Sequence, residues 1–146
     1  MELFFEEIGR EMLVAVAAPD HPIFDEPPSL ERATAYGWAV PHQMSVSYRF
    51  ETVFYRRNLP IPPQRLNCAS MALLRIAVTD WSLIGVLPAR LAAEQLASGT
   101  LRRIELDDLS FDFAITLITA KSAPLSQTAL LLIAELRTCF KDGKKG

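Results

Sequence analysis

Residues 12–22 read Met12-Leu13-Val14-Ala15-Val16-Ala17-Ala18-Pro19-Asp20-His21-Pro22, an apolar run that stops at a proline-flanked turn. The run is partly β-branched and holds no polar residue before the first proline, so it predicts a strand that is buried on both faces. Strands of this kind belong to parallel or mixed sheets that helices cover on both sides. This stretch therefore indicates an α/β fold.

The same run has the length of the apolar core of a secretion signal. A signal peptide begins with a positively charged region, whereas the residues before this run include Glu2, Glu6, Glu7 and Glu11 against Arg10. No apolar stretch approaches the roughly 20 residues that cross a bilayer. We therefore expect a cytoplasmic chain that is not exported and does not enter a membrane.

The composition argues against several further functional classes, namely nucleic-acid binding, binding to anionic lipid and cysteine-based metal or redox sites. The 146 residues include 15 Lys+Arg and 17 Asp+Glu, a formal net charge of −2, and half of them are apolar. That balance provides a core but no positive field for nucleic acid or anionic lipid. Cys68 and Cys139 are too far apart for a zinc knuckle or a redox pair, so we expect two small buried apolar groups.

Strands alternate with helices along the rest of the chain, which is the pattern of an α/β domain. Serines suited to N-caps precede three of the helices: Ser29, Ser70 and Ser126. The expected further strands are 38–41, 64–68, 83–87, 100–106 and 111–120. The expected helices are 30–35, 46–58, 71–78, 88–97 and 127–140, with a solvated tail over 141–146.

Two of these helices carry more apolar surface than one small sheet can cover. The helix over 71–78 is apolar around nearly its whole circumference, which predicts burial on two sides. The final helix has a similar surplus, in Leu130, Leu131, Leu132, Ile133 and Leu136. We therefore expect a homodimer or a higher oligomer, with rearranged packing or domain swapping as alternatives. The expected interface residues are Met71, Leu74, Ile76 and Val78.

Motifs that carry catalysis are absent from the sequence: there is no Gly-rich phosphate loop, no HExxH and no GxSxG. His21 and His42 each lie beside a proline, which favours hydrogen-bonded loop residues. Four carboxylates, Glu105, Asp107, Asp108 and Asp112, fit a solvated loop better than a metal site, because no second ligand set accompanies them. We expect no enzyme activity, no cofactor and no metal.

Four stretches together resemble a known family. They are residues 13–23 with His21-Pro22, then Trp38-Ala39-Val40-Pro41, then Ile84-Gly85-Val86-Leu87-Pro88, and Ala97-Ser98-Gly99-Thr100-Leu101. Their order and spacing are similar to the effector-binding domain of LysR-type transcriptional regulators, over about residues 8–140. That family senses small molecules and is not catalytic.

The resemblance implies a fold like that of the type 2 periplasmic binding proteins, in which two α/β lobes are joined by crossover strands. The chain then holds one complete lobe, a mixed sheet flanked by helices, over about 16–104. Residues 1–15 and 111–140 supply crossover strands and the last helix of the other lobe. The family's winged helix-turn-helix does not precede Met1, so DNA binding would need a domain that is absent from this chain.

The resemblance also implies a site. The family holds its effector with polar groups from the turn after the Trp-led strand and from the start of the following helices. The matching positions are Ser45, Val46, Ser47, Tyr48 and Ser70. Exposed N–H groups and short hydroxyls suit an anion such as a carboxylate. As ordinary N-caps, Ser47 and Ser70 would have no such role.

Two other functions remain open on the sequence. The chain could be a stand-alone homodimeric interaction or structural protein that binds no ligand. It could also be an enzyme with an unrecognised carboxylate pair, which nothing else in the sequence supports.

Overall fold

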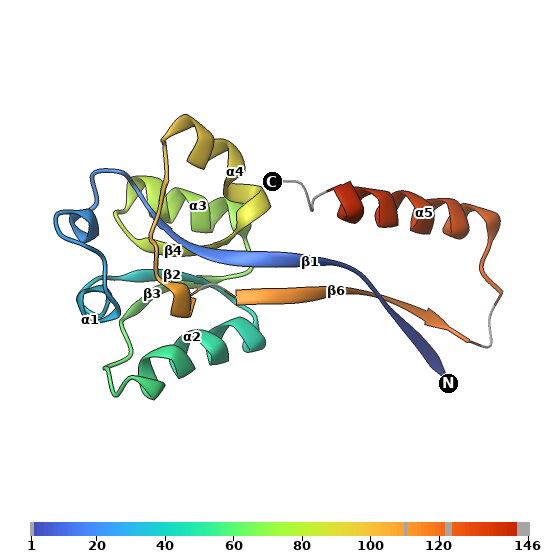
Figure 1. Cartoon of the computed structure of the whole chain (residues 1–146), viewed down its shortest axis with the longest axis horizontal. Coiled ribbons are helices and arrows are strands. Elements are labelled where there is room, and N and C mark those ends of the chain that lie inside the picture. Colours follow the sequence, from blue (N-terminus) through green and yellow to red (C-terminus); the bar gives the residue numbers. More distant parts are fainter. Residues whose placement is uncertain (1, 110, 122–123, 143–146) are drawn as a thin grey trace. The chain divides into compact units, whose positions relative to one another are not determined.

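The apolar run that predicts the α/β class forms the second half of a long strand, β1 (Leu3–Ala17). The computed structural model describes residues 2–109, 111–121 and 124–142. The sheet has the strand order β3-β2-β4-β1-β5, and β6 pairs with β1 (Figure 1). Strands β2 and β3, and likewise β2 and β4, are parallel, whereas β1 is antiparallel to β4 and β5. The predicted mixed α/β sheet is confirmed.

Most predicted elements appear close to their expected places. The remaining strands are β2 (Trp38–Pro41), β3 (Gln64–Cys68), β4 (Ile84–Pro88), β5 (Arg102–Arg103) and β6 (Phe111–Ala120). The α-helices are α1 (Leu30–Ala33), α2 (Met44–Arg56), α3 (Met71–Asp80), α4 (Ala89–Ser98) and α5 (Gln127–Asp142). Short 3₁₀ turns, η1 (Pro22–Phe24) and η2 (Asp107–Leu109), complete the set.

Several boundaries differ from the expectations, including the following three. Strand β1 starts well before the apolar run, because its glutamate-rich half pairs with β6. Strand β5 is only two residues long where a longer strand was expected. Helix α5 continues to Asp142 into the predicted tail, whose residues 143–146 lie outside the described residues.

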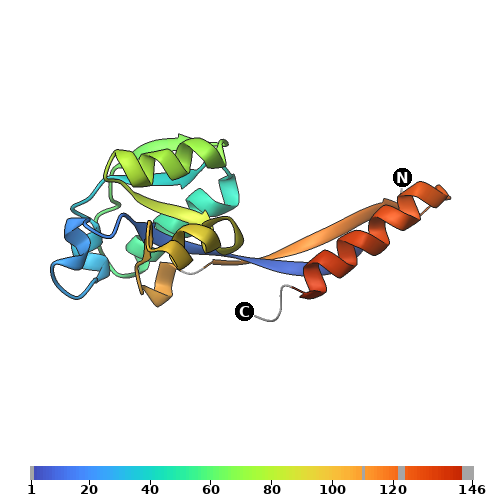
Figure 2. The ribbon, with the colours of Figure 1, turned by 90° about the horizontal axis from the view of Figure 1, so that it is seen from above.

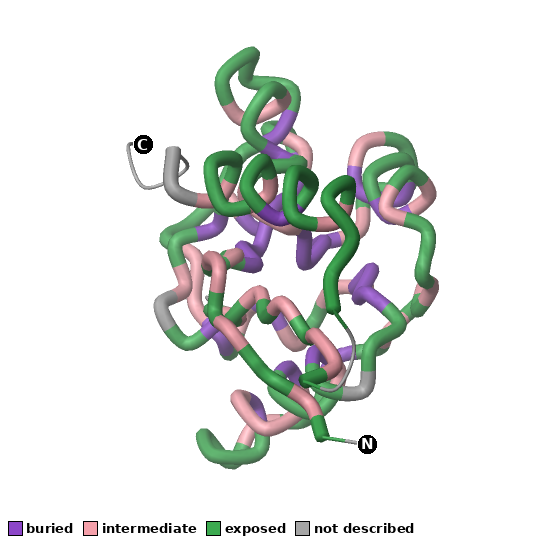
Figure 3. Tube along the Cα trace, turned by 90° about the vertical axis from the view of Figure 1, so that its right-hand side faces the viewer, coloured by how far each residue is buried: buried purple, intermediate pink, exposed green. Residues whose placement is uncertain are grey.

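The chain divides into two compact units. Unit 2 is the continuous stretch Met12–Phe111, and unit 1 combines Met1–Glu11 with Asp112–Gly146. In unit 1, α5 runs alongside the paired β1 and β6 (Figure 2), and Arg137 of α5 donates to Glu6 of β1 at 2.7 Å. Much of the outward surface of α5 is exposed (Figure 3).

Unit 2 holds the main core, which has one layer on each face of the sheet. Ala39 of β2 belongs to a buried cluster with Leu74 and Val78 of α3. The neighbouring residue, Trp38, points to the other face, where its ring lies 4.9 Å from that of Phe50 in α2. Because successive strand residues face opposite sides, α2 and α3 cover opposite faces of the sheet (Figure 1).

Candidate functional site

Unit 2 has two crossover connections between parallel strands, and their helices lie on opposite faces of the sheet. The place where the connections change face is called a topological switch point, and it lies at one edge of this sheet. Strand β2 leads into α2 on one face, and the adjacent β3 leads into α3 on the other. The two strands end side by side, since Pro41 is the register partner of Cys68. In open α/β sheets, ligands bind outside the carboxyl ends of strands at such a point. This edge is therefore the first place to look for a ligand site.

Three polar side chains form a linked cluster at this edge, which we call the β2–β3 polar cluster: His42, Ser47 and Asn67. The Asn67 side-chain oxygen lies 2.5 Å from His42 Nδ1, and its amide nitrogen donates to Ser47 Oγ at 3.4 Å. Asn67 also donates to Gln64, whose amide donates to Glu51 of α2 at 3.0 Å. These bonds fix the start of α2 against the end of β3.

Helix α2 begins earlier than expected, and Ser47 is not its N-cap. Gln43 is the N-cap, and its side chain makes no capping bond. The N–H groups of Val46 and Ser47 both donate to the Gln43 carbonyl at 2.9 Å. Within the described part of the chain, no acceptor is found for the N–H of Ser45. The hydroxyls of Ser45 and Ser47 lie in the first turn, whereas the Val46 side chain is buried and unavailable to a ligand.

Helix α3 begins as expected. Ser70 is its N-cap, and its hydroxyl accepts from the Leu73 N–H at 3.3 Å. The Ser70 carbonyl accepts from Leu74 N–H. The N–H groups of Met71 and Ala72 precede these bonded ones and belong to the exposed first turn. Two helix N-termini therefore stand at the ends of adjacent strands.

Tyr48 does not join the β2–β3 polar cluster. Its side chain is 71% exposed and lines a hollow of about 450 Å³ on the outer face of α2, with Thr52, Tyr55, Arg56 and Ile61. The ring thus belongs to the solvent-facing side of α2.

The residues expected at an oligomer interface separate into two groups. Leu74 and Val78 lie fully inside the core of unit 2, so they are not on the surface. Met71 is half-buried, and Ile76 is 43% exposed. In the chain by itself α3 is buried on one side, and Ala72 and Arg75 face solvent. Burial of its second side by another copy stays a prediction.

The charged groups that could suggest catalysis are occupied by ion pairs. Asp108 accepts from Arg57 at 2.7 Å in unit 2, and Asp112 accepts from Arg10 at 2.7 Å in unit 1. Glu105 pairs with Arg103 at 3.5 Å. The side chain of Asp107 lies outside the described residues. Among the described residues, no group of three or more His, Cys, Asp or Glu side chains could hold a metal.

The remaining single-residue expectations have mixed outcomes. His21 is a hydrogen-bonded loop residue as predicted: its Nδ1 accepts from the Ile23 N–H at 3.0 Å. Cys68 is half-buried, but Cys139 is exposed, so its predicted burial is wrong. In the part of the chain that the structure describes, no helix is long and apolar enough to span a membrane.

Two members of the β2–β3 polar cluster, His42 and Asn67, are not among the residues predicted for the site. Each lies at or just after the end of a predicted strand, which is a signal available in the sequence. The proline before His42 favours a loop role, and Asn67 lies within a predicted strand.

Known proteins provide an independent comparison. No curated protein matches the chain. Among solved structures, the chain is similar to the regulatory domain of HypT from Salmonella typhimurium, bromide ion-bound, with a TM-score of 0.74 and 15% identity, covering 97% of this chain and 66% of that one. It is also similar to the CcmR regulatory domain of Synechocystis PCC6803 in complex with 2-PG, with a TM-score of 0.75 and 16% identity, covering 97% of this chain and 68% of that one.

A third structure is the effector binding domain of QuiR in complex with shikimate, at a TM-score of 0.68 and 17% identity, covering 96% of this chain and 66% of that one. The chain thus spans about two thirds of these regulatory domains, and 47% of full-length HypT. At such identities these likenesses establish the fold. A family model described as the LysR substrate binding domain matches residues 1–141. The chain therefore belongs to the LysR substrate binding domain family, the effector-binding part of LysR-type transcriptional regulators.

Proposed function

We propose that this chain binds a small anionic effector, such as a carboxylate, at the edge of unit 2 where β2 and β3 end. The observation that carries the proposal is the placement of two helix N-termini, those of α2 and α3, at the ends of adjacent strands. Each N-terminus has a positive partial charge and N–H groups that point outward. The QuiR domain was solved with shikimate, which is a carboxylate, and this supports the ligand class.

Each polar residue of the edge has a definite part in the proposal. The N–H of Ser45 and the first-turn N–H groups of α3 donate to the anion. The hydroxyls of Ser45, Ser47 and Ser70 provide further hydrogen bonds, and Asn67 orients Ser47. Val46 contributes only by holding the first turn of α2 against the core, where its side chain is buried. Tyr48, one turn away on the outer face, is the least supported member of the expected set.

Titration of the ¹⁵N-labelled chain with small carboxylates tests this directly. Shikimate, benzoate and acetate are the probes, and benzamide and acetamide are their uncharged counterparts. We expect amide shifts at Ser45, Met71 and Ala72 with the acids only. A ligand at 100 times its Kd should also stabilise the fold by about 2.7 kcal/mol. Equal shifts with the amides, or shifts confined to other parts of unit 2, contradict the proposal.

We further propose that the domain acts in the cytoplasm as the sensing part of a transcriptional regulator. The bound effector shifts the balance between conformations of the regulator. A separate winged helix-turn-helix domain reads the DNA, which agrees with the net charge of −2 on this chain. No catalytic step is involved, and binding alone carries the signal.

The chain also forms a homodimer in this proposal. The supporting observation is the apolar surface that its helices expose: Ile76 on α3, and Leu130, Leu131 and Leu132 on α5. Sedimentation velocity over a range of concentrations tests it, and a monomer at the highest concentration contradicts it. The same surface also favours a second function, a homodimeric interaction protein without ligand. Dimerisation with no response in the carboxylate titration identifies that function.

A further inference from the structure

The β2–β3 polar cluster is the end of a longer row of hydrogen bonds, which we call the Glu51–His42 row. The amide nitrogen of Gln64 donates to the Glu51 carboxylate at 3.0 Å, and that of Asn67 donates to the Gln64 oxygen at 3.1 Å. The Asn67 oxygen lies 2.5 Å from Nδ1 of His42. A carboxylate can only accept, so each amide has its nitrogen toward Glu51 and its oxygen toward His42.

This direction decides which nitrogen of the His42 ring carries hydrogen. Because the Asn67 oxygen can only accept, His42 Nδ1 must be the donor in the bond between them. A neutral imidazole carries a single N–H, so Nε2 is then an acceptor. The His42 side chain is exposed, and Nε2 has no partner among the residues that the structure describes. The ring therefore offers an unpaired acceptor at this edge of the sheet.

The other end of the same amide group bonds to Ser47. The Asn67 nitrogen donates to Ser47 Oγ at 3.4 Å, so the hydroxyl hydrogen of Ser47 is not used in that bond. In the described part of the chain, no acceptor is found for it. A donor hydroxyl and an acceptor nitrogen thus lie on the two sides of one amide group. A ligand carboxylate can bond to Ser47, but a group that bonds to neutral His42 Nε2 must bring its own hydrogen.

We propose that the effector is a hydroxylated carboxylate whose hydroxyl group donates to His42 Nε2. This inference rests on the proposed function and narrows its ligand class, because the carboxylate is held at the same edge by the first turns of α2 and α3. An ammonium group also donates, but the positive ends of the two helices repel a cation. A hydroxyl group is therefore the donor that this edge favours.

The protonation of the ring is tested without any ligand. Long-range ¹H–¹⁵N spectra of the full 146-residue chain, labelled at its two histidines, are recorded at pH 8.0 to keep the rings neutral. We expect His42 in the Nδ1–H form. His21 is the internal control with the opposite form, since its Nδ1 accepts from the Ile23 N–H. The spectrum of His42→Ala assigns the signals, and His42 in the Nε2–H form would overturn the inference.

A variant at the far end of the Glu51–His42 row tests what sets its direction. Glu51→Gln replaces a group that only accepts with one that also donates. Both amides of the row can then turn over, and we expect the His42 signals to move toward a mixture of the two N–H forms. Unchanged signals would contradict the assignment of Glu51 as the residue that positions the row.

Ligand pairs that differ only in their hydroxyl groups test the binding step. Shikimate is compared with 1-cyclohexene-1-carboxylate, and 3-hydroxybenzoate with 3-methoxybenzoate, by amide-shift titration. We expect the hydroxylated member to bind about two- to tenfold more tightly, the effect of one hydrogen bond. His42→Ala should abolish this difference and change the affinity for the other member by less than about twofold. Gln43→Ala is the matched control and should retain the difference, because Gln43 is exposed and makes no capping bond.

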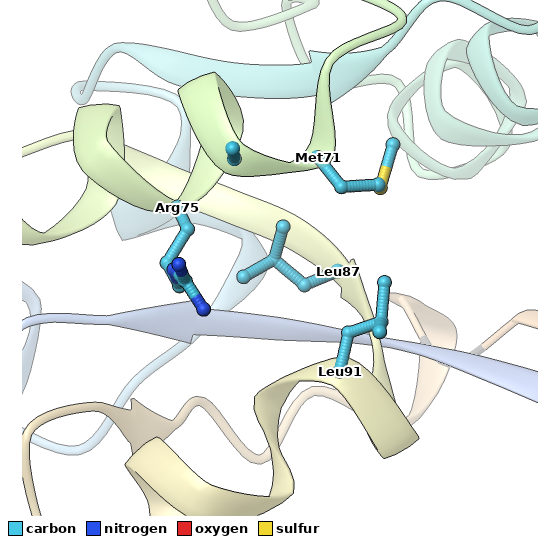
Figure 4. A pocket seen from close by; sticks show the side chains of 5 residues that line it. Met71, Arg75, Leu87 and Leu91 are labelled. Atoms are coloured by element: carbon cyan, nitrogen blue, oxygen red, sulfur yellow. The ribbon is translucent and has the colours of Figure 1, made fainter.

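An apolar recess on unit 2 is a competing place for a small carboxylate. It has a volume of about 200 Å³ and is lined by Met71, Ala72, Arg75, Leu87 and Leu91 (Figure 4). Its charged residue, Arg75, can only donate, so a ligand there should not depend on His42. Met71 belongs both to this lining and to the first turn of α3, so its amide shift does not distinguish the two places. Binding that is lost in Arg75→Ala but unaffected by His42→Ala would overturn the inference.

The outcomes separate the two proposals. If no carboxylate binds, the proposed function and this inference both fail. If both members of each pair bind equally, or if His42→Ala retains the difference, the edge still binds carboxylates and this inference alone fails. Circular dichroism verifies that every variant is folded.

Discussion

Gly85 of β4 lies directly under Val78 of α3: a Cβ atom on Gly85 would stand 2.2 Å from Val78 Cγ2. That distance is far shorter than any contact between non-bonded carbon atoms. Val78 is fully buried, and its branched side chain has few alternative rotamers. Helix α3 therefore approaches the sheet as closely as it does because residue 85 has no side chain. The position of α3, and with it that of Ser70, depends on this glycine.

Gly85→Ala should lower the free energy of unfolding by about 1–3 kcal/mol, the usual cost of overpacking a core. Urea denaturation measures the change. In the double variant with Val78→Ala, the two side chains no longer collide. The double variant should then be more stable than the sum of the single effects predicts, by at least about 0.5 kcal/mol. Strict additivity of the two changes in unfolding free energy would show that the contact between residues 85 and 78 does not limit how closely α3 approaches the sheet.

Stability should fall as the pH drops below the ordinary histidine pKa of 6.5, because of His21. Burial lowers the pKa of His21 in the folded chain, and its Nδ1 is already an acceptor for Ile23 N–H. The unfolded chain thus binds the proton more tightly than the folded one between the two pKa values. The stability that neutral His21 contributes is fully present above pH 6.5. It is lost progressively as the pH falls toward the lower pKa that His21 has in the folded chain.

Urea midpoints at pH 7.5 and 5.0 measure this effect. His21→Asn provides the control, since asparagine is a good acceptor at a helix start but does not titrate in this range. The variant should show a smaller drop between the two pH values than the unaltered chain. An equal drop would assign the pH dependence to other groups.

Ser70→Ala and Ser29→Ala form a matched pair that separates capping from ligand binding. Each serine is an N-cap whose hydroxyl accepts from an N–H three residues on, at 3.3 Å in both cases. Each variant should therefore lose about 1 kcal/mol of stability. Only Ser70→Ala should also weaken carboxylate binding, by about two- to tenfold for one lost hydrogen bond. Isothermal titration with shikimate compares them, and equal affinities would remove Ser70 from the site.

Gly9→Ala should loosen α5 from its strands. A Cβ atom on Gly9 would lie 2.6 Å from Phe140 Cβ, next to the helix backbone, so the helix itself must move. We expect faster hydrogen exchange across α5 with little change in the core of unit 2, measured by mass spectrometry. Gly99→Ala is the comparison: its Cβ meets nothing within 4 Å, and its φ of +75° confines the strain to the end of α4. Unaltered exchange in α5 after Gly9→Ala would contradict the argument.

The strands and caps that local chemistry specifies were predictable from the sequence. Strand β2 begins and ends as expected because Gly37 and Pro41 bound a short apolar segment. Gly99 ends α4 in the left-handed conformation that glycine favours. These features depend on residues only a few positions apart.

Features that depend on distant contacts were not predictable in the same way. The glutamate-rich half of β1 shows no apolar alternation, and it is a strand because it pairs with β6 near the other end of the chain. The start of α2 was misplaced because Gln43, which makes no capping bond, precedes it. The β2–β3 polar cluster was only partly predicted for the same reason, since Asn67 joins Ser47 across two elements.

The discontinuity of unit 1 has a consequence for how the protein is made on the ribosome. Unit 2, Met12–Phe111, is one uninterrupted stretch and can fold as soon as it has emerged. The first half of β1 is synthesised earlier, but it must wait for β6 before its backbone groups can pair. The segment before Met12 is therefore an unpaired strand edge while unit 2 is already folded, and such an edge is prone to aggregation.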